Sequence, residues 1–345
     1  MQETDVWARS IPVEILSHIF FLLPLSDLLE VLLVCRRWLE IGEHPAYWKD
    51  ITLDISTNNI KNLTKILDIK RLSSIQFDSD CQISEDNLKQ ITLSNIISLS
   101  TCCNDLSHVS QIQLTDCIYS MEKVNMNNTI LEDEQLISIF AVPTENHMNL
   151  TELCMSNQDL SNIPIRTIST TLCRLKTADI YDTQLTEPQL LCFFTEMSKD
   201  TNLVFLNISF SNLSAVPPAI LAKSINKLQK VNLMCTKLTS DQTKEIFSVM
   251  CVHTRLAELN MHGNHLTEVP PGAISTAVIR LRSVDMSETG LTEDQLIAMF
   301  KHSDTGHELE KLDVRYNDAV LELSEKIIRD AEKNIRNLFY TRYFT

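Results

Sequence analysis

Histidine, cysteine and glycine are the residues of this sequence whose types and spacing could support chemistry. His262 and His265 form a possible metal pair, but no third ligand is evident beside them. The ten cysteines are scattered, with no paired C-x-x-C framework and no nucleophile signature. The five glycines form no phosphate-binding loop. The sequence therefore predicts a protein that is not an enzyme and that holds no metal and no cofactor.

The element that must position any functional residue is a sequence repeat. Its leading apolar residues recur at steps that alternate between 25 and 28 residues, which gives a compound period of 53. Each copy opens with L-x-x-L-x-L, and this alternation predicts a short strand with one buried face. The leading residues are Leu150, Leu175, Leu203, Leu228, Leu256, Leu281 and Leu309. A fixed period of this size predicts a stacked-repeat architecture.

Two features of each copy, its ninth position and its helix start, define the repeat and divide it into two types. The ninth residue is polar, because a buried turn leaves backbone groups that need partners. The long repeats next contain the motif Leu-Thr-x-x-Gln, which is a capping box that starts a helix. Its threonines are Thr186, Thr239 and Thr292. Short repeats carry proline there, which predicts an extended arm and a shorter helix. The ninth residues are Thr129, Gln158, Thr183, Ser211, Thr236, Asn264, Thr289 and Asn317.

These repeats resemble the leucine-rich-repeat family, and their alternation resembles the two-type repeats of ribonuclease-inhibitor-like proteins. The resemblance covers residues 121–334 and implies an α/β fold class: a horseshoe-shaped solenoid of alternating short and long repeats. Residues 51–120 are expected to form irregular repeats of the same kind. Strands are expected there at Trp48-x-x-Ile51-x-Leu53, Leu72-x-x-Ile75-x-Phe77 and Val109-x-x-Ile112-x-Leu114. Residues 335–345 are expected to form a strand-like cap, or else a tail that folds toward the concave face.

A protein-binding patch is predicted on the concave face, where the non-core strand residues point outward. Large apolar side chains occupy such positions on three neighbouring strands, and aromatic residues anchor protein interfaces. They are Tyr181, Phe205, Phe210 and Met234. An acidic flank beside them would suit a basic or amide-rich target, and it includes Asp179, Asp182 and Asp285. The alternative is that the fifth-position Asp and Asn residues only hydrogen-bond along the sheet.

Residues 10–50 lie outside the repeat pattern and predict three helices. Pro12 opens the first helix and Pro24 follows its end. Asp27 and Glu30 form a capping signal for the second helix, and a short third helix is expected around Pro45–Trp48. The first two helices are apolar on more than one face, and so small an element cannot bury all of that surface itself. The excess predicts an interaction site.

This segment resembles an F-box. The resemblance rests on Pro12-x-Glu14-Ile15-Leu16, on Val34-Cys35-Arg36-Arg37-Trp38 and on Trp48, with Ile11-Pro12 where usual F-boxes have Leu-Pro. It implies docking onto the Skp-type adaptor of a cullin-based ubiquitin ligase. It assigns to the adaptor contact, or to the helix packing behind that contact, Pro12, Ile15, Leu16, Ile19, Leu23, Leu28, Val34, Cys35 and Trp38. An ordinary helical cap on a solenoid is the alternative.

Composition narrows the partners and the compartment. The net charge of −15 argues against nucleic acid as a partner. There is no apolar run of about 18 residues and no basic n-region, which argues against a membrane span and a signal peptide. Cysteines scattered through the repeats are typical of reduced core residues and favour the cytoplasm or the nucleus. The predicted domains are 1–9 (N-terminal segment), 10–50 (F-box), 51–120 and 121–334 (irregular and regular repeats) and 335–345 (cap or tail).

Together these features predict the substrate-recognition subunit of a cullin-type ubiquitin ligase. The F-box would bind the Skp-type adaptor and, through it, a cullin, while the concave repeat face would bind an unknown target protein. The alternative is a non-catalytic binding or scaffold protein of the ribonuclease-inhibitor kind with a helical N-terminal cap. Co-purification with a Skp-type adaptor distinguishes the two.

Overall fold

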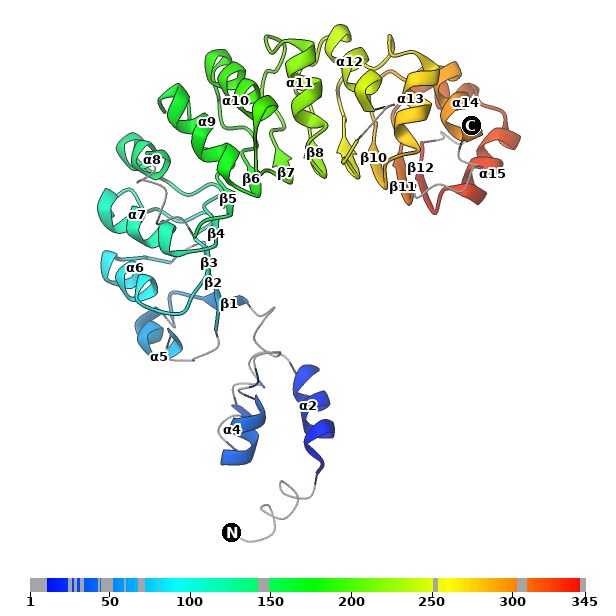
Figure 1. The fold of residues 1–345 in the computed structure, drawn as a ribbon. Coiled ribbons are helices and arrows are strands. Elements are labelled where there is room, and N and C mark those ends of the chain that lie inside the picture. Colours follow the sequence, from blue (N-terminus) through cyan, green and yellow to red (C-terminus); the bar gives the residue numbers. More distant parts are fainter. Residues whose placement is uncertain are drawn as a thin grey trace. The chain divides into compact units, whose positions relative to one another are not determined.

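The protein, described here from a computed structural model, forms two compact units. The described residues are 11–23, 27, 30–31, 34–42, 44, 52–58, 60–67, 72–79, 81–141, 149–250, 254–302 and 309–341. One unit comprises residues 1–135 and 146–150, and the other comprises 136–145 and 151–345. Within each unit the helices that connect successive strands lie on one side of a row of parallel strands (Figure 1). The predicted α/β fold class, a solenoid of parallel strands connected by helices, is confirmed. None of the described helices is both long and apolar enough to span a membrane.

The first unit opens with helices α2 (Val13–Phe21) and α4 (Arg36–Gly42). They pack through the rings of Phe20 and Trp38, which meet edge to face with centroids 5.4 Å apart. Arg37 adds a hydrogen bond from its guanidinium to the carbonyl oxygen of Ile11 at 2.6 Å. The second predicted helix lies largely outside the described residues, and the third lies wholly outside them.

Four parallel strands follow in the first unit, each paired with the next. They are β1 (Thr52–Ile55), β2 (Ser74–Phe77), β3 (Ser98–Ser100) and β4 (Lys123–Asn125). The segments between them contain η2 (Ile60–Asn62), α5 (Leu63–Leu67), α6 (Glu85–Thr92) and α7 (Gln111–Ser120), and α8 (Asp133–Phe140) runs on into the second unit.

The strand predicted at Val109–Leu114 is wrong, because α7 begins within it. Ile112 is 76% exposed there, so it is no core strand residue. The strand is instead β3, which is led by Ile96 and has Thr101 where the pattern expects a third leucine. The hydroxyl of Thr101 lies 3.3 Å from that of Thr129 in the next repeat, and both residues are buried. A polar residue in a core position therefore hid this repeat from the apolar pattern.

Strand β1 is shifted by two residues from its predicted register. Leu53 pairs with Ile75, and Ile55 pairs with Phe77. Ile55 is completely buried and Leu53 only partly, so the pair Leu53 and Ile55 takes the place predicted for Ile51 and Leu53. A shift by two keeps every side chain on the same face, so alternation could not distinguish the registers.

The second unit contains eight parallel strands that pair in sequence order, position for position. They are β5 (Glu152–Cys154), β6 (Thr177–Asp179), β7 (Phe205–Asn207), β8 (Lys230–Asn232), β9 (Glu258–Asn260), β10 (Ser283–Asp285), β11 (Lys311–Asp313) and β12 (Asn337–Phe339). Strand β12 extends the sheet beyond the last full repeat, after η4 (Asp318–Glu322) and α15 (Glu325–Asn334). Residues 342–345 of the predicted cap or tail lie outside the described residues.

The two repeat types differ in their helices as the prolines predict. Each short-repeat helix is shorter than the long-repeat helix that follows it. The short-repeat helices are α9 (Ile165–Arg174), α11 (Pro218–Ile225) and α13 (Pro271–Val278). The long-repeat helices are α10 (Glu187–Lys199), α12 (Ser240–Met250) and α14 (Glu293–His302).

The glutamine of each capping box also links two repeats. The side-chain oxygen of Gln242 accepts from the Thr239 amide at 2.8 Å, as the capping box predicts. Its amide nitrogen donates to the carbonyl oxygens of Leu213 and Val216 in the preceding repeat, at 2.7 and 2.6 Å. Gln189 and Gln295 make the equivalent bonds. The helix cap is thus also an inter-repeat clamp, which the local motif alone does not reveal.

Candidate functional site

One face of helix α2 presents apolar side chains to solvent. Ile15 is 53% exposed, Ile19 43% and Leu22 70%. Their spacing of four and three residues places them along one stripe of the helix. Pro12, just before the helix, is also exposed, and Leu23, just after it, is half-buried. An apolar stripe of this kind on a helix surface is typical of an interaction site.

Burial divides the other residues that the F-box resemblance assigns. Leu16 is buried, and the half-buried Trp38 contacts Phe20, so these two hold the helix pair together. Val34 is exposed and Cys35 is half-buried. Leu28 lies outside the described residues. The sequence does not distinguish residues that would contact the adaptor from residues that pack the helices together, because both roles need apolar side chains. The structure distinguishes them by burial, since Ile15 and Ile19 are exposed and Leu16 is buried.

The aromatic side chains predicted for target binding gather on the uncovered face of the second unit's sheet. The rings of Tyr181 and Phe210 meet edge to face with centroids 5.2 Å apart, and Phe210 is 44% exposed. The ammonium of Lys230 lies 5.2 Å from the centroid of Phe205. Phe205 and Met234 are half-buried. The structure thus joins Tyr181 to Phe210 and places a cation on Phe205, a mixed apolar and cationic surface.

Phe210 occupies a backbone position that disfavours it. From the repeat led by Ile96 to the one led by Leu309, the eighth residue has a positive φ, which the side chains of bulky residues oppose. Small or polar residues fill most of these positions, namely Cys103, Asn128, Asn157, Asp182, Cys235, Gly263 and Glu288, and the exceptions are Phe210 and Tyr316. At Phe210 the angle is +63°. A large aromatic retained at a strained turn and left partly exposed has the features of a binding residue.

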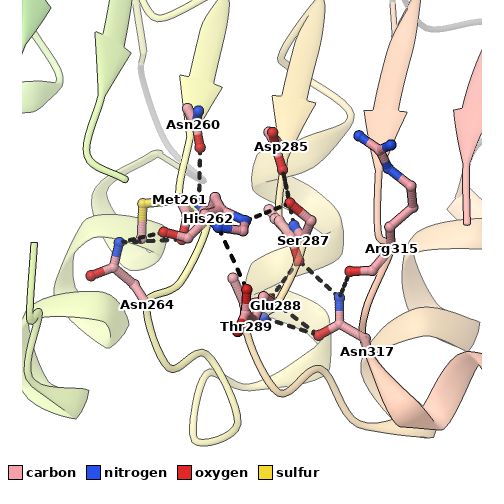
Figure 2. Close-up of polar contacts among 11 residues, drawn as sticks. Asn260, Met261, His262, Asn264, Asp285, Ser287, Glu288, Thr289, Arg315 and Asn317 are labelled. Carbon is pink, nitrogen blue, oxygen red and sulfur yellow. Dashed lines mark hydrogen bonds and ion pairs between the residues drawn. The ribbon is translucent and has the colours of Figure 1, made fainter. Parts of the chain in front are cut away.

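The acidic and amide column serves the turns. Where the fifth residue of a repeat is Asp or Asn, its side-chain oxygen accepts from the backbone amide two residues later, as Asp285 does from Ser287 at 3.0 Å (Figure 2). Asp179 also accepts from the side chains of Ser156 and Asn207, each at 2.9 Å. Asp179 therefore makes the hydrogen bonds along the sheet that the alternative predicts, and its role in target binding stays a prediction. Asp182 lies outside the column, exposed at an eighth position.

At His262 a histidine, a serine and a carboxylate are neighbours, and their hydrogen bonds connect the turns of two repeats. The hydroxyl of Ser287 donates to Asp285 at 2.6 Å and therefore accepts from Nδ1 of His262 at 2.8 Å (Figure 2). A serine nucleophile needs the histidine to accept its proton, which is the opposite polarity. His265 is exposed. Within the described ranges, no three His, Cys, Asp or Glu side chains gather as a metal site requires.

The thiols on this face are poor nucleophiles. Burial, with a smaller contribution from the carboxylates of Asp179 and Glu152, raises the pKa of Cys154 to about 11. Burial likewise raises the pKa of Cys235. Since the thiolate is the reactive form of cysteine, both side chains remain protonated at neutral pH.

Family models match both regions of the chain. An F-box-like model matches residues 8–54, which include α2 and α4. A Leucine Rich Repeat model matches residues 255–277, the short repeat led by Leu256. The chain therefore contains an F-box-like segment followed by leucine-rich repeats. A comparison with curated proteins finds no match.

Solved structures share the fold of this chain at low sequence identity. A chain in the crystal structure of the Rad7 and Elc1 complex in yeast is 15% identical with a TM-score of 0.55, and the match covers 100% of this chain and 93% of that chain. The leucine-rich repeat-containing protein LegL7 from Legionella pneumophila is 13% identical with a TM-score of 0.50, covering 82% of this chain and 97% of that chain. At such identities the likeness establishes the fold.

Proposed function

We propose that this chain is the substrate-recognition subunit of a cullin-type ubiquitin ligase. Its F-box-like segment binds a Skp-type adaptor and, through it, a cullin, and the uncovered sheet face binds the target. The observation that carries this proposal is the exposed apolar stripe of α2 within a segment that matches an F-box-like model. The yeast chain of similar fold comes from a two-protein complex, which adds support for a protein partner.

The mechanism in this proposal is positional. A chain that binds an adaptor at one site and a target at another raises the effective concentration of the target near the enzyme that the adaptor recruits. The chain itself then breaks and forms no bonds, in keeping with the protonated thiols and the inverted polarity of the His262 network. Target lysines are presented to an enzyme that the adaptor and cullin bring.

The adaptor site is tested by the double substitution Ile15→Asp with Ile19→Asp. Central apolar contacts in an interface are each worth about 2 kcal/mol, so the affinity for a co-expressed Skp-type adaptor should fall at least about 100-fold. Folding should persist, because both side chains already face solvent. Ile112→Asp is the matched control, since Ile112 is exposed on a helix outside the F-box-like segment. One-to-one adaptor binding by the double variant would disprove this surface.

The target site is tested by the double substitution Phe205→Ala with Phe210→Ala. Proteins captured by crosslinking to the wild-type chain in complex with its adaptor should be lost from the variant, whereas adaptor binding should remain. Phe339→Ala is the control, because Phe339 is an exposed aromatic on β12. Unchanged capture by the double variant would mean that the target binds at another surface.

A stable monomer that does not bind the adaptor would favour the scaffold alternative instead.

A further inference from the structure

Two adjacent cysteines lie in the turn that follows strand β3 of the first unit. Cys102 and Cys103 are the seventh and eighth residues of the repeat led by Ile96, and they are the only neighbouring cysteines in the sequence. Their sulfur atoms are 3.5 Å apart, close enough for one thiol to donate a weak hydrogen bond to the other. Cys103 is exposed and Cys102 is half-buried. Neither the F-box-like segment nor the aromatic face accounts for this pair.

The turn that carries the pair has fewer internal hydrogen bonds than the turn beside it. In the next repeat the side-chain oxygen of Asn125, the fifth residue, accepts from the Asn127 amide at 3.1 Å. The fifth residue before the cysteine pair is Ser100, whose buried hydroxyl has no hydrogen-bond partner among the described residues. The side-chain oxygen of Asn104, the ninth residue, is likewise buried without a donor from that part of the chain. The two sulfur atoms can therefore adjust to a ligand without breaking a fifth-position hydrogen bond.

The geometry of the pair favours an atom that bridges both sulfurs over a disulfide between them. Cα atoms joined by a trans peptide bond are about 3.8 Å apart. A disulfide usually has Cα atoms about 4.4–6.8 Å apart and sulfur atoms about 2.0 Å apart. In a tetrahedral site with metal–sulfur bonds of about 2.3 Å, by contrast, two bridged sulfurs lie about 3.8 Å apart. The observed sulfur separation of 3.5 Å is close to the bridged value.

Two thiols with no further ligand restrict the kind of atom that can bridge them. A structural zinc site needs four ligands, and no group of three His, Cys, Asp or Glu side chains occurs in the described part of the chain. A two-coordinate ion such as Cu(I) places its sulfurs on opposite sides, which separates them by about two bond lengths. Arsenic(III) with one organic substituent is a soft atom with two remaining bonds, which point to the same side. It needs two thiols and no other ligand.

The protonation of Cys102 favours the same ligand. Burial raises the pKa of Cys102, and the hydrogen bond with Cys103 raises it as well. A metal cation binds the thiolate and must displace this proton, and exchange with a disulfide also begins from a thiolate. An organic arsenic(III) oxide brings its own oxygen, which leaves with both thiol protons as water. The overall reaction therefore needs no ionised thiol.

We propose that Cys102 and Cys103 form a covalent binding site for arsenic(III) compounds that carry one organic group. With phenylarsine oxide, the arsenic–oxygen double bond and two S–H bonds break, two As–S bonds form, and one water is released. Arsenic stays in its trivalent state, so no oxidant or reductant is needed. The second As–S bond forms within one turn, so the pair should bind about 100-fold or more tighter than a single thiol.

The test is the addition of one equivalent of phenylarsine oxide to the reduced full chain, followed by intact-protein mass spectrometry. One phenylarsenic group should be found per chain, and titration with a competing dithiol should measure its affinity. Cys102→Ser and Cys103→Ser should each weaken binding at least about 100-fold. Cys235→Ser is the matched control, because Cys235 is also an eighth residue but has no adjacent cysteine, and it should leave binding within about twofold. Circular dichroism should confirm that all three variants fold.

Four results would overturn the proposal. They are the absence of an adduct on the unmodified chain, full binding by Cys102→Ser, release by a monothiol as readily as by a dithiol, and loss of binding in Cys173→Ser. The last result would place the arsenic between Cys173 and Cys192, which lie on the neighbouring helices α9 and α10.

This test is separate from the ligase proposal. The Ile15→Asp with Ile19→Asp variant should keep the arsenic adduct while losing the adaptor. Cys103→Ser should lose the adduct and keep the adaptor, since it lies outside the F-box-like segment.

Discussion

Helix α2 exposes apolar side chains to water, whereas the turns of the second unit bury polar side chains. In α2, large apolar residues such as Ile15 and Ile19 face water. In the turns, polar residues such as Asn264 and Asn317 are buried, and the protein itself supplies their partners. The side-chain amide of Asn264 donates to Leu233 and Met261 at 2.6 and 3.2 Å, and its oxygen accepts from the Leu238 amide at 3.2 Å.

The difference separates a self-contained region from one that awaits a partner. A buried amide that bridges two repeats contributes to folding and makes the stack specific. An apolar stripe in water contributes nothing to folding and gains its stabilisation on binding. The three substitutions below test how sharp this division is.

The largest effect should come from Asn264→Leu. This change leaves the Leu238 amide without a partner and removes one of the two hydrogen bonds to each of the carbonyls of Leu233 and Met261, so the free energy of unfolding should fall by about 3 kcal/mol. Asn337→Leu, at an exposed position on β12, should change it by less than about 0.5 kcal/mol. Urea unfolding followed by circular dichroism measures both. Equal values would mean that the turns do not hold the repeats together.

A smaller change in the free energy of unfolding is expected at Phe210, where a partly exposed aromatic residue has a positive φ. Phe210→Gly and Phe210→Ala both remove the contact with Tyr181, but only glycine relieves the positive φ. The glycine variant should therefore be about 1 kcal/mol more stable than the alanine variant. At Phe205, the first residue of strand β7, the alanine variant should instead be the more stable one, by about 0.5–1 kcal/mol. The same order at both sites would remove the argument that Phe210 is retained against strain.

The smallest effect should come from Lys244→Met, which breaks the exposed ion pair with Glu268 at 2.6 Å. The hydrogen bond from Lys244 lowers the pKa of Glu268, and Glu268 in turn raises the pKa of Lys244. The pair therefore stabilises the fold above pH 4.5, the ordinary pKa of a glutamate, and this stabilisation is lost as the pH falls through the folded pKa of Glu268. It is also lost as the pH rises through the folded pKa of Lys244. Solvent screening should keep the shift in melting temperature within error at neutral pH. A clear shift at neutral pH that persists in strong acid would contradict this account.

Much of the fold could be predicted because its signals are local. The step between leading leucines, the polar ninth residue and the Thr-x-x-Gln helix starts each meet a need of a few neighbouring residues, and the second unit is built from them. The positive φ at the eighth position was missed, although Gly263, Asn128 and Asn157 there are residues that tolerate it. The site residues remain predictions. Of these, the structure brings Tyr181 and Phe210 together and commits Asp179 and Asp285 to hydrogen bonds in the turns.

The sequence alone determined that the chain stacks repeats of two lengths and begins with an F-box-like segment, because both are patterns of side chains close along the chain. Only the tertiary structure decided which apolar residues of α2 face outward, where Ile55 sets the register of β1, and that the rings of Tyr181 and Phe210 meet. Those outcomes depend on residues that meet only when the strands have stacked, and no spacing within one repeat contains that information.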